Sequence, residues 1–244
     1  MKRFLYLATI AALAAGCRTL DIQEPTGTIS VNLEPEVIVK SCAWDDTDNY
    51  TVSVTSGTAV SGLPYQAAYK DFEPLSLPMG TYTVSAWNCT EEDSVTGYGL
   101  KRLYGSKDAT LSLEDPDQTV ALECVLVNSL VSVIFDSSVT GVFDGLKVDI
   151  TSGKRTVSIS ESGEVKEAWF NPAEISWTIS GTVKENGKIV SQSNNMRLDA
   201  RKNLKINVHL TYSNGQISMT PNNISINQIS SATEVPVDGT NPYE

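Results

Sequence analysis

The stretch Leu77-Pro-Met-Gly-Thr-Tyr-Thr-Val-Ser-Ala86 carries the clearest fold signal in the 244-residue sequence. Its proline and glycine favour a tight turn, because proline fixes φ and glycine accepts positive φ. After the turn, apolar and hydroxyl side chains alternate with the period of a β-strand that has one face in a core. The pattern predicts that Tyr82 and Val84 are buried and that Thr83 is exposed.

The same alternation recurs on both sides of this stretch, and no segment shows the period of an amphipathic helix. We expect about eleven strands separated by turn residues, which is typical of β-sandwiches. Asn186-Gly187 and Asn214-Gly215 each stand between strand-like segments, which is the strongest short signal for a β-hairpin. The sequence therefore predicts an all-β protein.

The chain is long enough for two sandwiches of about 100 residues each. A strand over 119–127 would close the first and a strand over 130–135 would open the second, almost without a linker. We therefore expect two tandem antiparallel β-sandwich domains, transthyretin-like or immunoglobulin-like. In order, the expected parts are a signal peptide (1–16), a lipid-anchored tether (17–25), the first sandwich (26–128), the second sandwich (129–228) and a flexible tail (229–244).

Residues 1–16 have the features of a signal peptide. Two basic residues precede a mostly apolar run that is shorter than the about 20 residues needed to span a membrane. Ala14-Ala-Gly16 then places small residues directly before Cys17, as in bacterial lipoproteins, in which the chain is cleaved on the N-terminal side of the cysteine and acyl chains are added to it. The position three before the cysteine is usually leucine and is Ala14 here. The alternative is an ordinary secretory signal beside which a cysteine falls by chance.

The lipoprotein interpretation predicts where the protein lies and what it contacts. We expect attachment to the outer membrane through a lipid on Cys17, at the cell surface or on the periplasmic face. The net charge of −11, from 29 acidic and 18 basic residues, argues against nucleic acid as a partner. Nucleic-acid-binding proteins present a basic face, and none is visible in this sequence.

Three cysteines follow Cys17, and an odd number cannot pair fully within one chain. Cys124 lies in phase with leucines in an apolar run and is expected to be a small buried residue. A disulfide between Cys42 and Cys89 is possible. The single histidine, His209, has polar neighbours in phase and is expected at the surface rather than in a metal or catalytic site.

No segment has the spacing of a catalytic or metal-binding motif. The acidic runs 45–48 and 91–93 lack the regular spacing and turn glycine of a calcium loop. Adjacent carboxylates are also not the opposed pair that acid–base catalysis needs. No phosphate loop, nucleophile elbow or zinc pattern occurs. We therefore expect a non-enzymatic protein with no cofactor and no metal.

Three segments, Tyr69–Ala86, Leu103–Lys107 and Glu123–Val133, together resemble a family of Bacteroides-type lipoproteins known as domain of unknown function 4493. The likeness is strong over 50–135 and weaker to residue 212. The family looks related in shape to the fimbrillin lipoproteins, tandem transthyretin-like sandwiches that build surface fimbriae. The resemblance implies a cell-envelope lipoprotein with a β-sandwich fold, and it carries no catalytic residues.

Aromatic side chains are the candidates for contact with a glycan, because a flat apolar ring can pack on a sugar ring. The alternative is that loops cover them as rim aromatics. Trp177 is expected in the core, and Trp169 has no clear assignment. The candidate glycan contacts are Trp44, Trp87, Tyr98 and Tyr104.

Asp93-Ser-Val95 resembles the Asp-(Ser/Thr)-apolar acceptor pattern of protein O-glycosylation in Bacteroides-type bacteria. The pattern falls in an expected loop, where a glycosyltransferase could reach Ser94. A three-residue pattern also arises easily by chance, which is the alternative.

Two functions are therefore carried forward. The first is a fimbrillin-like adhesion or structural subunit at the cell surface, with other fimbrial subunits as partners. Such subunits assemble by strand exchange, and the first strand, 27–33, is the candidate to leave because Pro35 interrupts its ladder. The tail 229–244 could supply or guide the replacing strand. The second function is a carbohydrate-binding surface lipoprotein in nutrient capture.

Overall fold

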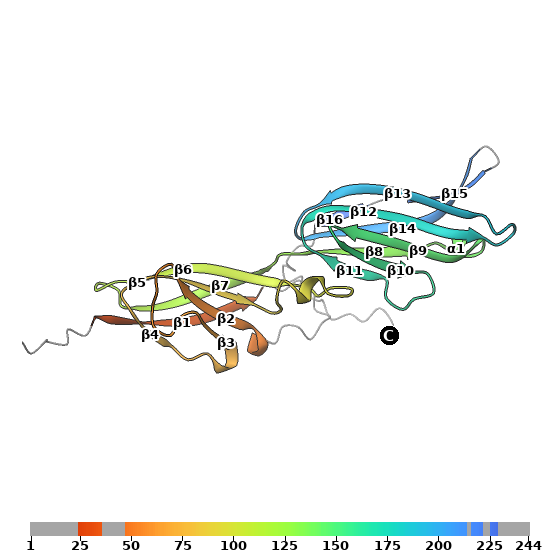
Figure 1. Cartoon of the computed structure of the whole chain (residues 1–244). Coiled ribbons are helices and arrows are strands. Elements are labelled where there is room, and N and C mark those ends of the chain that lie inside the picture. The colour runs from red at the N-terminus through yellow and green to blue at the C-terminus, as the bar shows by residue number, and fades with distance from the viewer. Residues whose placement is uncertain (1–23, 36–46, 214–215, 222–224, 229–244) are drawn as a thin grey trace, which may run out of the picture.

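The computed structural model describes residues 24–35, 47–213, 216–221 and 225–228, and the side chains among them up to residue 210. Two β-sandwich domains lie end to end and give an elongated molecule (Figure 1). The prediction of an all-β chain with tandem sandwiches is confirmed. Cys17, Cys42 and Trp44 lie outside the described residues, as do the predicted signal peptide (1–16) and the predicted tail (229–244).

The first domain contains seven strands and three short 3-10 helices. They are β1 (Thr26–Pro35), η1 (Thr47–Asn49), β2 (Thr51–Ser56), β3 (Tyr65–Ala68), η2 (Tyr69–Asp71), β4 (Leu75–Pro78), β5 (Gly80–Trp87), η3 (Asp93–Val95), β6 (Leu103–Leu111) and β7 (Asp117–Leu126). These strands form one sheet in the order β3-β2-β5-β6-β7-β1-β4, which folds over its own core.

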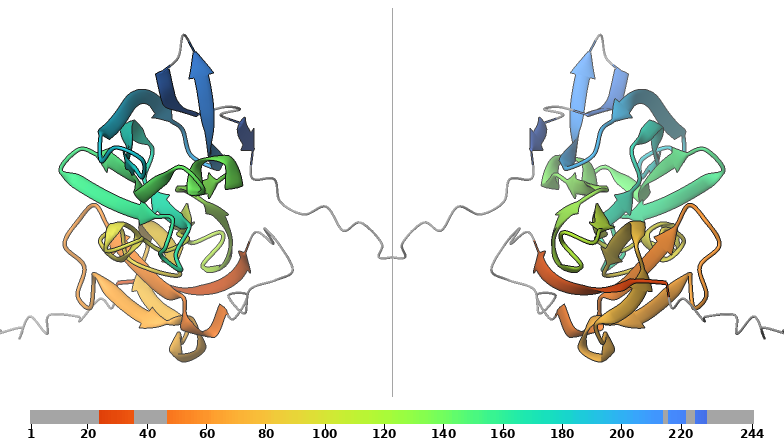
Figure 2. Two further views of the ribbon diagram at one scale, coloured as in Figure 1. Left: turned by 90° about the vertical axis from the view of Figure 1, so that its right-hand side faces the viewer. Right: turned by 90° about the vertical axis from the view of Figure 1, so that its left-hand side faces the viewer.

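The second domain contains nine strands and one helical turn. They are β8 (Ser129–Phe135), α1 (Ser137–Thr140), β9 (Phe143–Ser152), β10 (Arg155–Ser160), β11 (Glu167–Phe170), β12 (Ala173–Val183), β13 (Ile189–Leu198), β14 (Lys202–Ser213), β15 (Gln216–Pro221) and β16 (Ser225–Gln228). One sheet has the order β10-β9-β12-β13, and the facing sheet has the order β11-β8-β14-β15, with β16 also paired to β14. The ends of β14 and β15 project beyond the body of the domain (Figure 2).

Strand β5 forms as its sequence predicts. Tyr82 and Val84 are 2% and 0% exposed, and the Tyr82 hydroxyl donates a hydrogen bond to the Pro78 carbonyl at 2.6 Å. Thr83 is partly exposed, and its hydroxyl donates to Asp108 on β6 at 2.8 Å. The inward face of β5 therefore anchors the first core, and its outward face carries cross-strand polar pairs.

Each domain has its own hydrophobic core, and the change from one to the other falls between Leu126 and Val131. The second core includes Trp177 as its largest fully buried side chain, as expected. Trp169 belongs to β11 of the second domain, yet it packs against the core of the first. It is therefore a contact between the domains.

The first seven strands of the second domain repeat the order of the first domain. In each domain the first strand lies between the last and the fourth (β7-β1-β4 and β14-β8-β11), and the remaining four follow one pattern (β3-β2-β5-β6 and β10-β9-β12-β13). One pair in each domain departs from the expected antiparallel arrangement. β1 runs parallel to β7, and β8 runs parallel to β14. The first strand of each domain is thus held beside the seventh by pairing that is distant in sequence.

Candidate functional site at the domain junction

The link between the domains is short and bonded on both sides. Asn128 is fully buried, and its amide donates to the Leu100 carbonyl at 2.7 Å and accepts from the Arg102 N–H at 3.1 Å. Its own carbonyl accepts from the Arg201 N–H at 3.0 Å, on the side of the second domain. A buried amide whose oxygen and nitrogen are both bonded fixes the chain direction, because breaking either bond leaves a buried polar atom unpaired.

Ser129 continues this bonding into the second domain. Its hydroxyl donates to the Asp199 carbonyl at 2.6 Å and accepts from the Lys202 N–H at 2.9 Å. The hydroxyl therefore bridges the turn that leads from β13 into β14. Two consecutive residues of the link are therefore hydrogen-bonded, Asn128 through its side chain to the first domain and Ser129 through its side chain to the second.

The connection between β5 and β6, residues 88–102, reaches from the first domain onto the second. The Tyr98 backbone carbonyl accepts a hydrogen bond from the Trp169 N–H at 2.8 Å. The Tyr98 side-chain hydroxyl donates to the Ser158 carbonyl at 3.3 Å. Gly99 has φ +75°, and a Cβ there would lie 2.5 Å from the Ser94 carbonyl oxygen and 2.7 Å from that of Trp169. Only glycine allows this close approach of the two backbones.

Arg155, at the start of β10, joins three elements at this contact. Its guanidinium donates to the Trp169 carbonyl at 2.7 Å and to the Gly97 carbonyl at 2.8 Å, and it lies over the Phe170 ring at 4.5 Å. Burial lowers the pKa of Arg155 from its ordinary value. A charged donor bonded to two carbonyl groups holds each more strongly than a neutral donor would. Arg155 therefore binds the loop of the first domain to β11 of the second.

Two of the four predicted glycan contacts lie side by side, Tyr98 does not join them, and Trp44 is outside the described residues. Trp87 is the cross-strand partner of Tyr104 on the outward face of β5 and β6, and both are partly exposed. The Tyr104 hydroxyl donates to Ser85 at 3.4 Å, and the Arg102 guanidinium lies 5.3 Å from its ring centre. Tyr98, although 42% exposed, is engaged at the domain junction instead.

The expectation that Ser94 is accessible is wrong. Ser94 lies in η3 and is fully buried. Its hydroxyl donates to the Glu91 carbonyl at 2.6 Å, with Asn171 of the second domain 3.3 Å away. A transferase cannot reach this oxygen in the folded protein. The short helix turns the serine inward against the second domain, which a three-residue pattern does not reveal.

Neither described thiol has a lowered pKa, and the histidine belongs to no metal-binding group among the described residues. Cys124 is fully buried, and burial raises the pKa of its thiol to about 11. Cys89 is half-buried, burial also raises its pKa, and it forms no disulfide with any described residue. His209 is partly exposed on β14.

Within the described ranges, no group of three or more His, Cys, Asp or Glu side chains is arranged to hold a metal ion. No helix among the described residues is long and apolar enough to cross a membrane. The arrangement at the junction can fix two domains relative to each other. Its hydrogen bonds join the link and the connection between β5 and β6 to the second domain.

The residues that build the junction were not identified from the sequence. Arg155 and Asn128 bond to partners far away along the chain, so no local pattern marks them. The available signal was the length of the connection between β5 and β6, since most hairpin loops have about two to five residues. A long connection with its own turn residues indicates a contact beyond the hairpin.

Comparisons with known proteins give similar structures at low identity. A protein of Bacteroides eggerthii, provisionally described as a cell adhesion protein, is 12% identical, covers 84% of this chain and 96% of its own, and has a TM-score of 0.44. A fimbrial assembly protein of Parabacteroides distasonis is 10% identical, with coverage of 84% and 98% and a TM-score of 0.43. A protein of Bacteroides thetaiotaomicron, provisionally described as polysaccharide-binding, is 13% identical, with coverage of 80% and 98% and a TM-score of 0.44.

Similarity at this level does not indicate what this chain binds. No curated protein matches the sequence. The family comparison is specific, because a single family model covers residues 26–238 and so spans both sandwich domains. The chain belongs to the family described as Domain of unknown function (DUF4493).

Proposed function

We propose that this protein is a non-enzymatic lipoprotein of the cell envelope that acts as a structural or adhesive subunit at the cell surface. The observation that carries the proposal is the bonded junction between its two domains. Neighbouring domains in one chain usually move relative to each other unless their interface is extensive. Here a short link, a reaching loop and Arg155 support a single elongated body.

An elongated body suits a subunit that carries load or presents a surface away from the membrane. The proposed lipid on Cys17 would hold one end, and β1 begins at Thr26. The intervening residues 18–25 span at most about 29 Å when fully extended. A short tether and a fixed junction would transmit force from the membrane to the far domain, which a flexible pair of domains would not do.

The proposal is tested on intact cells of the source bacterium. Protease added outside should remove the protein, and mass spectrometry should find an acyl group on Cys17. Cys17→Ser should block lipidation and leave unprocessed or mislocalised precursor, and cells carrying it should adhere as poorly as a deletion strain. A protein that is protected until the cells are lysed, or that carries no lipid on Cys17, would refute the proposal.

A second function, glycan binding for nutrient capture, is favoured by one observation. Trp87 and Tyr104 form a neighbouring aromatic pair on an outward sheet face, with Arg102 beside them. The test is binding of a glycan panel by wild type, Trp87→Ala and Tyr104→Ala, with Tyr98→Phe as the control because its ring remains. Binding that is lost in both alanine variants and kept in the control would support this function. Unchanged binding or none at all would remove it.

A further inference from the structure

Among the described residues, the edge of strand β13 away from β12 carries no strand ladder, although β15 lies close to part of β13. It pairs with β12 only, with Thr182 opposite Ile189 and Ala173 opposite Leu198. The Val183 N–H donates to the Lys188 carbonyl at 2.9 Å, which starts the ladder. In an antiparallel ladder, every second residue directs its backbone N–H and C=O groups to the neighbouring strand. The even-numbered residues of β13 therefore bond to β12, and the backbone groups of the odd-numbered residues point to the free edge.

One of these outward groups is satisfied only locally. The Asn195 N–H, which belongs to the outward set, is bonded by the side-chain oxygen of the preceding Asn194 at 2.8 Å. A neighbouring side chain therefore takes the place that an adjacent strand would fill. The bond is short-range and exposed, so an incoming strand could displace it at little cost.

The repeated strand order explains why this edge is open. In the first domain, β6 stands in the place of β13 and pairs with β7, with Leu103 opposite Leu126. In the second domain, β14 stands in the place of β7, but β15 and β16 occupy its free side. β15 and β16 therefore occupy the edge of β14 that would otherwise pair with β13.

The open edge also lacks the features that usually prevent pairing with another chain. Natural edge strands are protected by charges, proline or bulges. The eight residues 189–196 contain no charged residue, no proline and no glycine, in a chain with a net charge of −11. Ile189 is 74% exposed. Arg197 at the end of the strand already pairs with Asp199 at 3.1 Å and Glu174 at 4.0 Å.

We propose that β13 pairs with β13 of a second copy of this chain, antiparallel, about a two-fold axis at Ser193. In this register the outward-bonding residues meet one another, so Ser193 faces its own copy and Ser191 faces Asn195. Val190 meets Met196 on the core side, and the stem of Arg197 covers Ile189. Apart from Arg197 opposite Ile189, each pair joins polar with polar or apolar with apolar side chains, and no two like charges face each other.

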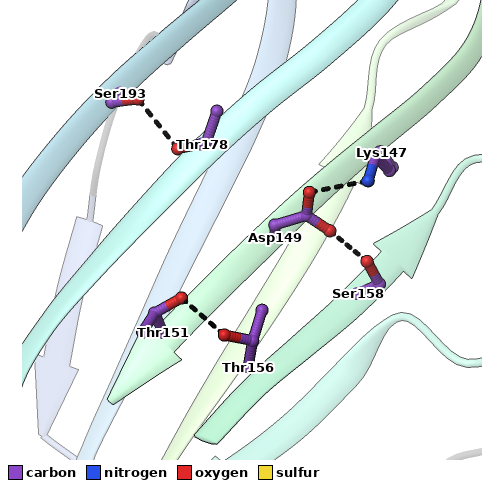
Figure 3. A network of polar contacts seen from close by, with 7 residues as sticks. All are labelled: Lys147, Asp149, Thr151, Thr156, Ser158, Thr178 and Ser193. Carbon is purple, nitrogen blue, oxygen red and sulfur yellow. Dashed lines mark hydrogen bonds and ion pairs between the residues drawn. The ribbon is translucent and has the colours of Figure 1, made fainter. Parts of the chain in front are cut away.

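The neighbours of Ser193 are compatible with this axis. Its hydroxyl is 2.8 Å from that of Thr178 on β12, and the same outward face carries Thr151 paired with Thr156 (Figure 3). The side chain therefore lies along its own sheet and leaves the backbone edge free. Pairing would join the two four-stranded sheets into one continuous eight-stranded sheet, since each sheet has four strands.

The first test is a disulfide across the axis in the full-length chain, with Cys17→Ser to prevent lipidation. In a bonded antiparallel pair the two Cα atoms lie about 5.5 Å apart, which is within the range of a disulfide. Ser193→Cys should therefore give a covalent dimer on mild oxidation. Thr178→Cys, on the same face but one strand inward, is the matched control and should stay monomeric. Equal cross-linking of the two variants would overturn the proposal.

The second test measures the association itself by sedimentation. Ser193→Lys places two like charges opposite each other and should weaken dimerisation at least about tenfold, whereas Thr178→Lys should not. A protein that stays monomeric up to about 1 mM, or a dimer that Ser193→Lys leaves intact, would overturn the proposal. These results are independent of surface location and of Cys17, so they do not depend on the proposed function.

Discussion

The two domains share one strand order but end their sheets differently, and the difference concerns the seventh strand. In the first domain β7 pairs with β6 and β1, so the sheet closes over its core. In the second domain β14 pairs with β8, β15 and β16, and β13 is left at an edge. One topology therefore yields one continuous seven-stranded sheet beside the proposed membrane tether, and two separate sheets with β13 at an edge in the domain beyond it.

The cores are also coupled in one direction. Trp169 of the second domain packs against the first core, whereas no described residue of the first domain belongs to the second core. We therefore expect damage to spread from the second domain to the first more readily than in reverse.

The largest expected effect comes from a charge in either core. Val84→Asp and Ile179→Asp each place a carboxylate where the wild-type side chain is fully buried, which should cost more than about 4 kcal/mol of unfolding free energy. Hydrogen exchange should show that Val84→Asp unfolds the first domain alone. Ile179→Asp should unfold the second domain and also weaken the first, because Trp169 is lost from it.

The control for this comparison is Thr81→Asp, on the outward face of the same strand. Thr81 is exposed and bonds only to the Thr110 hydroxyl at 3.1 Å, so the change should cost about 1 kcal/mol or less. Thr83 is a poorer control than its alternation indicates, because a carboxylate there would face Asp108. Equal damage from Thr81→Asp and Val84→Asp would contradict the strand phase.

The next effect concerns the first strand of each domain. β1 can be deleted without separating the two domains, whereas β8 follows directly on the link between them and cannot. Deleting residues 18–34 removes Ile29 and Leu33 from the core and breaks the ladders to β7 and β4. The resulting groove should accept β1 from intact protein. Mixing the two proteins should then give a ladder of oligomers on mild-detergent gels, whereas deleting 229–244 alone should not.

Aggregation of the truncated protein, together with a full-length protein that stays monomeric after limited proteolysis, would contradict strand exchange. The subunit interpretation would then give way to glycan binding. Pairing on both sides of β1 makes its departure costly, because two ladders must break at once.

A smaller effect is expected at the junction. Arg155→Ala removes two charge-assisted hydrogen bonds and should cost about 2 kcal/mol of stability. It should also broaden the distribution of distances between labels on the two domains. Arg155→Lys should restore little, because one ammonium group cannot reproduce the planar fork that reaches both carbonyl groups. Lys154→Ala, at the exposed neighbouring position, should change neither quantity.

Much of the fold could be predicted from sequence because it depends on local alternation. β5 and the hairpin at Asn186-Gly187 are examples, and Gly187 has φ +71° as such a turn requires. β14 and β15 likewise pair with Ser213 opposite Gln216, on the two sides of the Asn214-Gly215 step. These elements are encoded within a few residues, so their patterns predict them.

Other features could not be predicted, for different physical reasons. β11 has only four residues, which is too short to show a period. The middle of β13, residues 191–195, is polar on both faces, so alternation does not mark the strand. The parallel pairing of β1 with β7, and the junction around Arg155, join residues far apart along the chain. Ser94 was misplaced because its exposure depends on the second domain and not on its neighbours in sequence.

The smallest expected effect is a pH dependence of stability that differs between the domains. Cys124 lies in the core of the first domain, and the second domain contains no cysteine. Burial raises the pKa of its thiol to about 11, from an ordinary value of 9.0. Between these two pH values the unfolded chain loses the proton and the folded chain keeps it. The stability of the first domain should therefore be unaffected below pH 9.0 and should fall as the pH rises toward 11.

The measurement is chemical unfolding at several pH values from 8 to 11, followed by hydrogen exchange in each domain separately. Burial also raises the pKa of Tyr82 in the same domain, so the informative quantity is the difference between wild type and Cys124→Ala. That variant should lose part of the decline in the first domain and change nothing in the second. A decline of the same size in the variant would mean that Cys124 titrates in the folded protein as it does in the unfolded chain.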